Sequence, residues 1–490
     1  MISRIRMRRP LFALVLIVLS CGSLSGCAQL TSDPEIHALI RDGEFRRADA
    51  AIADRLARDT SLTPAARLAL QFERERMARI RLDFRKSEPE VRTFITKVLP
   101  EASEADYRRW EASGALEMMV IDGEKCYFHS AARNLFRIDS AARRVWREKH
   151  RDDPPSTGLA SERGLDEHIG AIMAAVRTTG KTSVLPVRLQ IEHVIRVNAD
   201  AVPPGEMVRC WIPFPREISG RQEEITLIGS DPAVHILADT AQLQRTIYLE
   251  RPAVGGAQTV FSVTYAYTSS GLYYPVDPSV VLPVVVSPEL EPYMREEPPH
   301  IVFTPELRAL SAEVIGSEKN PLLVARKLFA WMDRHVPWAS AREYSTVPSL
   351  SGYAFANRHG DCGMQTMLFV TLLRLNGIPA RWQSGWEFRP PGDSMHDWGM
   401  VYFAPYGWVP MDATYGMRDS DNDAFRYFYV NGMDSYRLIF NDAAGTPFYP
   451  AKVHPRSETV DSQRGEVEWR GGNLYFDTWD WELKMRQMKN

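Results

Sequence analysis

The chain carries almost no net charge. Its 490 residues include 59 lysines and arginines against 62 aspartates and glutamates, a formal net charge of -3 at pH 7. Proteins that bind nucleic acid usually show a basic excess gathered on one face. The balance therefore argues against nucleic acid or any strongly charged partner. The length and composition are those of a globular protein with about three domains.

Cysteine is also scarce. The sequence has five cysteines, which are Cys21, Cys27, Cys126, Cys210 and Cys362. The first two lie in an N-terminal targeting segment, so an odd number remains. An odd number does not suit a disulfide framework, and structural zinc sites normally use cysteines in tight pairs. We therefore expect no disulfides, no bound metal and no cofactor.

The apolar run near the N-terminus, Leu11 to Leu19, is too short to span a bilayer. Four arginines precede it and Leu24-Ser25-Gly26-Cys27 follows it, the order of a secretory signal peptide. The tetrapeptide resembles the bacterial lipobox, which implies removal of residues 1–26 and lipidation of Cys27. We expect a lipid-anchored protein of the cell envelope rather than a membrane-spanning one. Ala28 points by analogy to the outer membrane, with the protein on its periplasmic or surface face.

From Pro34 to about His150 the sequence pattern is mainly helical. Two expected helices, over residues 91–99 and 104–113, precede a strand pair that turns at Asp122-Gly123. For this winged-helix-like order we favour a structural or docking role, because DNA binding does not fit an envelope protein. We assign residues 27–180 to a helical N-terminal region that includes this segment.

The pattern then changes from helical to alternating. Val187, Leu189 and Ile191 alternate with polar residues, as do Phe261 and Val263 further on. Clusters of proline and glycine separate such runs. The alternation predicts an antiparallel β-sandwich over residues 181–295.

The rest of the chain, residues 296–490, combines helices with strands. Capping residues and apolar spacing predict helices over residues 305–315, 321–335 and 362–375. Alternation and aromatic residues predict strands near residues 398–403, 407–411, 427–429 and 436–439. Helices followed by an antiparallel sheet are typical of an α+β domain.

Cys362 begins the third of these helices. Unpaired backbone N–H groups and the helix dipole at that position favour a thiolate, which is the reactive form of cysteine. His396 lies at the far end of the strand over residues 398–403, and Asp412 ends the strand over residues 407–411. A hairpin between them would bring the imidazole and the carboxylate together. Cysteine, histidine and aspartate are the residue types of a thiol nucleophile, its base and the group that orients the base.

Several motifs around these residues resemble the core of the transglutaminase-like superfamily. They are Gly360-Asp361-Cys362, Leu373-Arg374 with Gly377-Ile378-Pro379-Ala380-Arg381, His396-x-Trp398 and Gly407-Trp408-Val409-Pro410-x-Asp412. The resemblance covers about one hundred residues and implies a papain-like fold with a triad of Cys362, His396 and Asp412. The family often has a glutamate where this chain has Met400, a difference that concerns the surroundings of the triad.

The resemblance implies a thioester intermediate formed from an amide of a peptide or protein. We favour hydrolysis by a peptidase or amidase, since the calcium loop of the animal crosslinking enzymes is absent. Protein crosslinking, or an inactive binding scaffold in the envelope, are the alternatives. The second donor to the oxyanion is left open between Trp338 and Tyr353, and the oligomeric state is undefined.

Two other interpretations concern histidines near the motif. A zinc site from His359, Cys362, His396 and Asp412 is a minor alternative to the triad. For His359 alone we expect a surface role, because a position before a helix N-terminus disfavours its protonated form.

Overall fold

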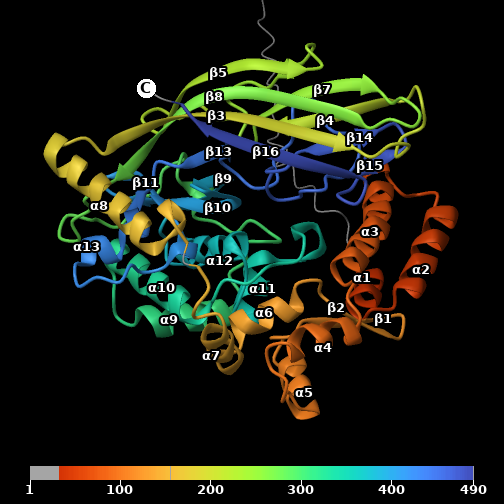
Figure 1. Cartoon of the computed structure of the whole chain (residues 1–490), viewed down its shortest axis with the longest axis horizontal. Helices are drawn as coiled ribbons and strands as arrows, with labels where there is room; N and C mark the ends of the chain where they lie inside the picture. Colours follow the sequence, from red (N-terminus) through yellow and green to blue (C-terminus); the bar gives the residue numbers. More distant parts are fainter. Residues whose placement is uncertain (1–32, 155, 489–490) are drawn as a thin grey trace, which may run out of the picture.

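The computed structural model describes residues 33–154 and 156–488. Figure 1 shows two antiparallel sheets at the top, a smaller sheet beneath them, a layer of helices below that, and the N-terminal helices to one side. This arrangement confirms the predicted α+β class. The expected signal peptide and Cys27 lie outside the described residues. Within the described residues, no helix is both long and apolar enough to cross a membrane.

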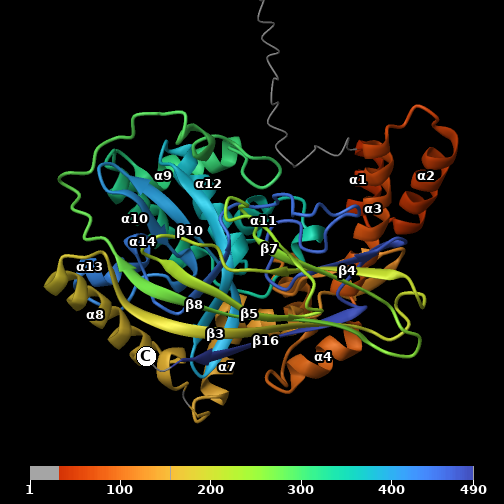
Figure 2. The same cartoon turned by 90° about the horizontal axis from the view of Figure 1, so that it is seen from above.

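The N-terminal region is mainly helical, with its own apolar core. Its elements are α1 (Pro34–Arg41), α2 (Phe45–Arg58), α3 (Pro64–Asp83), α4 (Glu88–Thr96), α5 (Glu104–Ala112), β1 (Met118–Ile121), β2 (Glu124–Tyr127), α6 (Ala131–Ile138), α7 (Ser140–Lys149), the short 3-10 helix η1 (Gly158–Ala160) and α8 (Glu162–Thr179). The turn between β1 and β2 uses the left-handed region at Asp122 and Gly123, as the sequence predicts. Helices α1 to α3 lie at the opposite end of the molecule from α8 (Figure 2).

The two upper sheets draw strands from distant parts of the sequence. They contain β3 (Ser183–Val197), β4 (Met207–Pro213), β5 (Gln222–Asp231), β6 (Ile236–Leu237), β7 (Thr246–Pro252), β8 (Thr259–Tyr273), β12 (Gly432–Met433), β14 (Glu466–Trp469), β15 (Gly472–Leu474) and β16 (Trp479–Gln487). One sheet has the order β12-β8-β3-β16 with β5 also on β8, and the other has the order β15-β14-β4-β7-β6. Strand β16 pairs with β3 along its whole length, so residues 479–487 form an edge of the first of these sheets.

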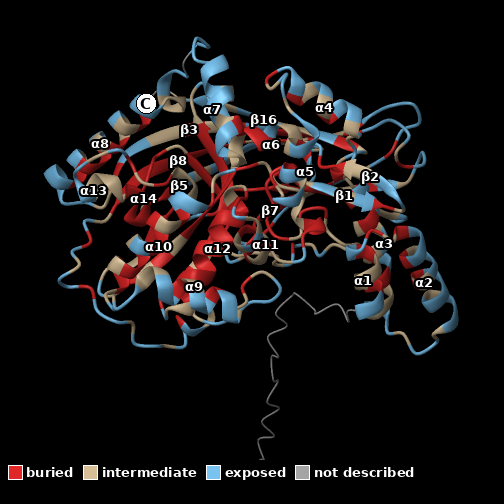
Figure 3. Cartoon of the chain, turned by 90° about the horizontal axis from the view of Figure 1, so that it is seen from below, coloured by how far each residue is buried: buried red, intermediate tan, exposed pale blue. Residues whose placement is uncertain are grey.

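The third sheet and its helices form the layer that holds the candidate site. Its elements are η2 (Glu291–Tyr293), α9 (Pro305–Ile315), α10 (Pro321–His335), η3 (Tyr344–Thr346), α11 (Leu350–Asn357), α12 (Cys362–Leu375), β9 (Ala380–Arg389), β10 (Gly392–Phe403), β11 (Gly407–Met411), η4 (Ala413–Tyr415), α13 (Asp423–Arg426), α14 (Phe428–Asn431) and β13 (Arg437–Asn441). The sheet order is β11-β10-β9-β13, all antiparallel. Helices α9, α10 and α12 have the predicted bounds. Helix α12 is almost entirely buried, as Figure 3 shows, because it packs against this sheet and against α10 and α11.

One predicted strand is wrong. The segment Tyr427–Tyr429, whose aromatic residues favour a strand, belongs instead to the end of a turn and to α14. Phe428 is fully buried there, and its ring stacks on Tyr273 of β8 at 5.8 Å between centroids. Tertiary packing of the aromatic side chains therefore decides the local structure over intrinsic propensity.

We predict that Gly385→Ala disrupts the smaller sheet. A Cβ at Gly385 would lie 1.8 Å from the carbonyl oxygen of Leu438, because β9 and β13 approach closely at that point. The obstacle is backbone, so we expect a loss at the upper end of the ~1–3 kcal/mol typical of overpacking. Denaturant midpoints would measure it. Gly392→Ala at the start of β10 is the matched control, since its Cβ meets its nearest atom at an ordinary 3.5 Å. Equal midpoints for the two variants would contradict the prediction.

Candidate active site

Cys362 occupies the first position of α12. The preceding Asp361 caps the helix, and its Oδ1 accepts a hydrogen bond of 3.0 Å from the backbone N–H of Met364. Gly360 is bridged to the chain at Trp338, which fixes the approach to the helix. The Cys362 side chain is half-buried, whereas Cys210 in β4 is fully buried. The fold thus places this thiol at a helix start with partial access.

The thiol of Cys362 hydrogen-bonds to a carboxylate that the sequence interpretation did not consider. Its Sγ lies 3.4 Å from Oδ2 of Asp397, the residue after His396. Burial raises the pKa of Cys362 well above its usual range, and the negative charges of Asp397 and Asp361 raise it further. Burial first, and the two adjacent carboxyl groups second, therefore oppose the thiolate that the helix start was expected to favour.

The predicted hairpin joins His396 to Asp412. Strands β10 and β11 pair from Gly399 opposite Met411 to Phe403 opposite Gly407, and the chain turns between them. His396 Nε2 then lies 2.8 Å from Asp412 Oδ2, with both side chains buried. When the imidazole is neutral, a proton on Nε2 bonded to the carboxylate leaves Nδ1 as the basic nitrogen.

Two further buried charges surround this pair. Arg437 from β13 is fully buried and lies 2.9 Å from Asp412 Oδ2, and Glu387 from β9 lies 3.7 Å from His396 Nε2. Burial would raise the pKa of Asp412, but the positive charges of His396 and Arg437 outweigh it and hold that pKa below its usual range. Burial would lower the pKa of His396, but the charges of Glu387 and Asp412 prevail and raise it. The site therefore makes this histidine a stronger base than usual.

The sequence predicts that Cys362, His396 and Asp412 act together, and the structure brings two of the three into direct contact. Among the described residues, no hydrogen bond joins the thiol to the His396 ring, because the thiol bonds to Asp397 instead. His396 and Asp397 thus serve different partners from neighbouring positions of β10.

Tyr344 and Gly363 complete the surroundings of the thiol. The Tyr344 hydroxyl lies 2.9 Å from Asp361 Oδ2 and 3.1 Å from Asp397 Oδ2. A Cβ on Gly363 would fall 2.0 Å from that hydroxyl and 2.8 Å from the Asp397 carboxylate, so only glycine permits this contact beside Cys362. The polar side chain in the His-Asp-Trp motif was the one sequence signal for Asp397.

The residues left open as oxyanion donors have different environments. The Tyr353 hydroxyl donates to Glu117 of the N-terminal region at 3.0 Å, so it is engaged away from the thiol. The ring of Trp338 is 40% exposed and lies under the guanidinium of Arg137. Trp338 therefore stays next to Gly360 and near the start of α12, whereas Tyr353 braces the N-terminal region.

The expectation of a surface role for His359 is wrong. This residue is 2% exposed, and its ring meets the edge of the Tyr353 ring at 5.7 Å between centroids. Burial lowers the pKa of His359 to about 4, so the ring is a neutral packing residue. Within the described ranges, no three or more histidine, cysteine, aspartate or glutamate side chains form a group that could hold a metal ion.

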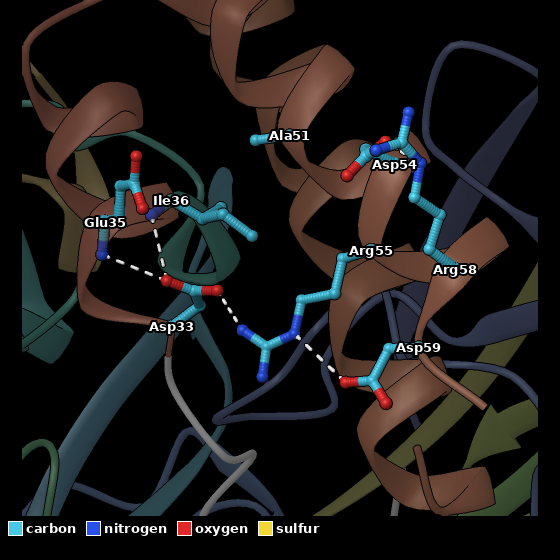
Figure 4. Close-up of a pocket in the computed structure, with 8 residues that line it drawn as sticks. All are labelled: Asp33, Glu35, Ile36, Ala51, Asp54, Arg55, Arg58 and Asp59. Carbon is cyan, nitrogen blue, oxygen red and sulfur yellow. Dashed lines mark hydrogen bonds and ion pairs between the residues drawn. The ribbon is translucent and has the colours of Figure 1, made fainter. Parts of the chain in front are cut away.

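A separate pocket lies between α1 and α2 (Figure 4). Its polar lining is internally paired: Asp33 bonds to Arg55, and Arg58 lies 2.7 Å from Asp54. These pairs are exposed at the surface and neutralise one another. The pocket is remote from α12 and presents no nucleophile.

Comparisons with known proteins point to one family. The model of the transglutaminase-like superfamily matches residues 308–413, which include Cys362, His396 and Asp412. An uncharacterized protein, YebA of Bacillus subtilis strain 168, is 33% identical over 78 residues, which cover 13% of this chain and 11% of that protein. The match thus spans about a tenth of the curated relative.

Solved structures give distant likenesses. A "Putative Cysteine Protease" from Cytophaga hutchinsonii has a TM-score of 0.44 at 16% identity, over 63% of this chain and 93% of that chain. The periplasmic domain of TgpA from Pseudomonas aeruginosa has a TM-score of 0.25 at 15% identity, over 48% of this chain and 93% of that chain. Both scores lie below 0.5, so the likenesses add no argument to the family match.

We predict that Glu387→Gln lowers the pKa of His396. The negative charge of Glu387 is the largest influence that raises this pKa, and the variant removes that charge while it keeps the shape of the side chain. Carbon-13 labelling of histidine with NMR titration would follow the ring, with His396→Gln used to assign its signal. Glu192→Gln, exposed on β3, should leave the titration unchanged. An unaltered His396 titration in Glu387→Gln would contradict the proposed influence.

Proposed function

Because residues 308–413 of this chain belong to the transglutaminase-like superfamily, we propose that the protein is a thiol enzyme that acts on amide bonds of peptides or proteins. Cys362 is the nucleophile, His396 its base and Asp412 the group that orients the base. The observation that carries the proposal is the 2.8 Å bond from His396 Nε2 to Asp412 in a hairpin adjacent to the cysteine helix. A raised pKa on His396 supports its role as a proton acceptor.

The reaction begins when the Cys362 thiol exchanges its bond to Asp397 for one to His396 Nδ1. The sulfur attacks the amide carbon while the imidazole takes the thiol proton. The backbone N–H of Cys362, at the helix start, donates to the oxyanion. The imidazolium then gives its proton to the departing amine, which leaves a thioester. Asp412 and Arg437 keep the imidazole oriented throughout, and their mutual bond keeps Asp412 ionised.

Hydrolysis of the thioester is the outcome we favour. Water then attacks the acyl carbon, His396 takes a proton from that water, and the acid product leaves Cys362 as a thiol. This gives a peptidase or amidase. Attack by an amine would give a crosslink through the same three residues, so the acceptor decides between the two reactions. The charge balance of the chain suits neutral or mixed peptide substrates over strongly charged ones.

A lipid anchor in the cell envelope belongs to this proposal. Its support is the sequence Leu24-Ser25-Gly26-Cys27 after a short apolar run. We expect Cys27→Ala to move the protein out of the membrane fraction, because the lipid attaches at that sulfur. Cell fractionation with mass spectrometry of the mature N-terminus would measure it, with Cys21→Ala as the control. Membrane retention of Cys27→Ala would remove the anchor from the proposal.

We predict that Cys362→Ala abolishes amide cleavage. Removal of the nucleophile of a triad usually costs on the order of 10³-fold or more in rate, and the change deletes one sulfur atom without a large cavity. A panel of unfolded protein substrates, followed by detection of new N-termini, would measure cleavage. Cys126→Ala in β2 is the matched control and should keep full activity.

The products separate the possible reactions. Incorporation of a fluorescent primary amine without new N-termini would show acyl transfer in place of hydrolysis. Cellular function retained by Cys362→Ala, with equal thermal midpoints for variant and native protein, would contradict the enzyme proposal and leave a binding scaffold.

A further inference from the structure

Asp397 is held firmly against the candidate nucleophile. Its side chain is 1% exposed, and its Oδ2 lies 3.4 Å from Cys362 Sγ and 3.1 Å from the Tyr344 hydroxyl. Its Oδ1 accepts a bond of 2.8 Å from the Gln463 amide, which also donates to the His396 carbonyl at 3.0 Å. Both carboxyl oxygens are therefore engaged by neutral donors. The group cannot turn away from the sulfur without loss of these bonds.

A count of protons shows that one of two neighbouring carboxyl groups, Asp361 or Asp397, carries a proton. The Tyr344 hydroxyl has a single proton but lies within hydrogen-bond distance of both Asp361 Oδ2 and Asp397 Oδ2. If both carboxyl groups were ionised, one of them would face the lone pairs of the hydroxyl oxygen. One of the two contacts is satisfied only when a carboxyl group carries a proton. The Cys362 thiol supplies a further proton to the same Oδ2 of Asp397.

We propose that Asp397 controls the charge of Cys362: its carboxyl group accepts the hydrogen bond of the thiol and holds the sulfur in its neutral form while that contact lasts. This rests on the proposed function, in which Cys362 is the nucleophile. A negative charge beside the sulfur opposes the thiolate. Loss of that charge, or departure of the thiol from Asp397, allows the thiol proton to leave. Asp397 is thus a positioning residue for the thiol, distinct from the base His396, which takes the proton.

The surroundings determine how much negative charge Asp397 carries beside the sulfur. Burial and the charge of Asp361 raise the pKa of Asp397 to about 7, so it holds a proton far better than an ordinary aspartate. His396 from β10 and the bonds from Tyr344 and Cys362 act in the opposite direction. The pKa of Asp361 itself rises to about 6, chiefly through burial.

Two more acidic groups act on the network from elements packed against it. Glu343, next to Tyr344, raises the pKa of Asp361 by its charge. Asp461, between β13 and β14, is affected by the charge of Asp397 and has a pKa well above its usual range, chiefly through burial. The cluster therefore has more carboxyl groups than its hydrogen-bond donors can stabilise in the ionised form. Some of these carboxyl groups are therefore favoured in the protonated form.

The test is the pH dependence of Cys362 alkylation by iodoacetamide in the soluble chain lacking residues 1–27, with peptide mapping. In Asp397→Asn the negative charge beside the sulfur is gone, so more thiolate exists at neutral pH. We expect Cys362 to react at least about tenfold faster at pH 7, with the midpoint of the rate profile shifted by about one pH unit or more to lower pH. Asp393→Asn, exposed on the same strand, is the matched control and should follow the native profile.

Tyr344→Phe keeps the test decisive should Asp397→Asn fail to fold. The lost hydroxyl had stabilised the ionised form of Asp397, so its proton affinity rises and reactivity should increase in the same direction by a smaller factor. Identical or slower alkylation of Cys362 in the folded variant, including no reaction in both proteins, would overturn the proposal. A faster reaction without turnover of any amide substrate would support the control of the thiol by Asp397 and contradict the enzymatic function, so the two failures are distinguishable.

Discussion

The buried guanidinium of Arg437 is the charge on which the imidazole half of the site depends. It is 0% exposed and lies within 2.9 Å of carboxylate oxygens of both Asp412 and Asp434. Without this cation, Asp412, Asp434 and Glu387 would each lose a positive partner in the protein interior, and loss of one partner of a buried pair typically costs about 3–5 kcal/mol. Strand β13 supplies the cation only because it pairs closely with β9. The ionisation of Asp412 therefore depends on the geometry of the sheet, because the pairing of β13 with β9 brings Arg437 to that carboxylate.

The thiol half of the site depends on a different part of the chain. The segment that carries Tyr344 contains one short 3-10 helix, so its own backbone does little to fix it. Side chains of the N-terminal region fix it instead. The Asn134 amide donates to the Ser340 carbonyl at 2.8 Å and accepts from the Ser340 N–H at 3.0 Å, and Asp83 accepts from the Thr346 hydroxyl at 2.8 Å. The N-terminal helices thus have a structural effect on the nucleophile, because they hold the hydroxyl that bonds to its carboxyl neighbour.

Local sequence signals predicted the helices and the hairpin of the site, but not the side chains that reach the site from distant parts of the sequence. Capping residues and apolar spacing defined the helix Cys362–Leu375, and the turn before Gly407 defined the hairpin that joins His396 to Asp412, because these features act over a few residues. Arg437, Gln463 and Tyr344 reach the site across 25, 66 and 53 residues from their carboxylate partners, and no short pattern encodes such contacts. The same limit applies to β16, whose place beside β3 follows from tertiary pairing. The buried position of His359 also depends on distant packing.

Asp412 and Asp397 carry the same carboxyl group, but their surroundings shift the two pKa values in opposite directions. Asp412 faces the cations of Arg437 and the imidazole, so its pKa is lowered and it stays ionised. Asp397 faces an amide, a hydroxyl and a thiol, and its pKa is raised to about 7 by burial first and by Asp361 second. Pairs of titratable groups whose surroundings drive their proton affinities apart are typical of sites that move protons. Neighbouring positions of β10 thus present a base to the ionised carboxylate and a carboxyl group to the sulfur. The order of events follows: the thiol must leave Asp397 before its proton can reach His396.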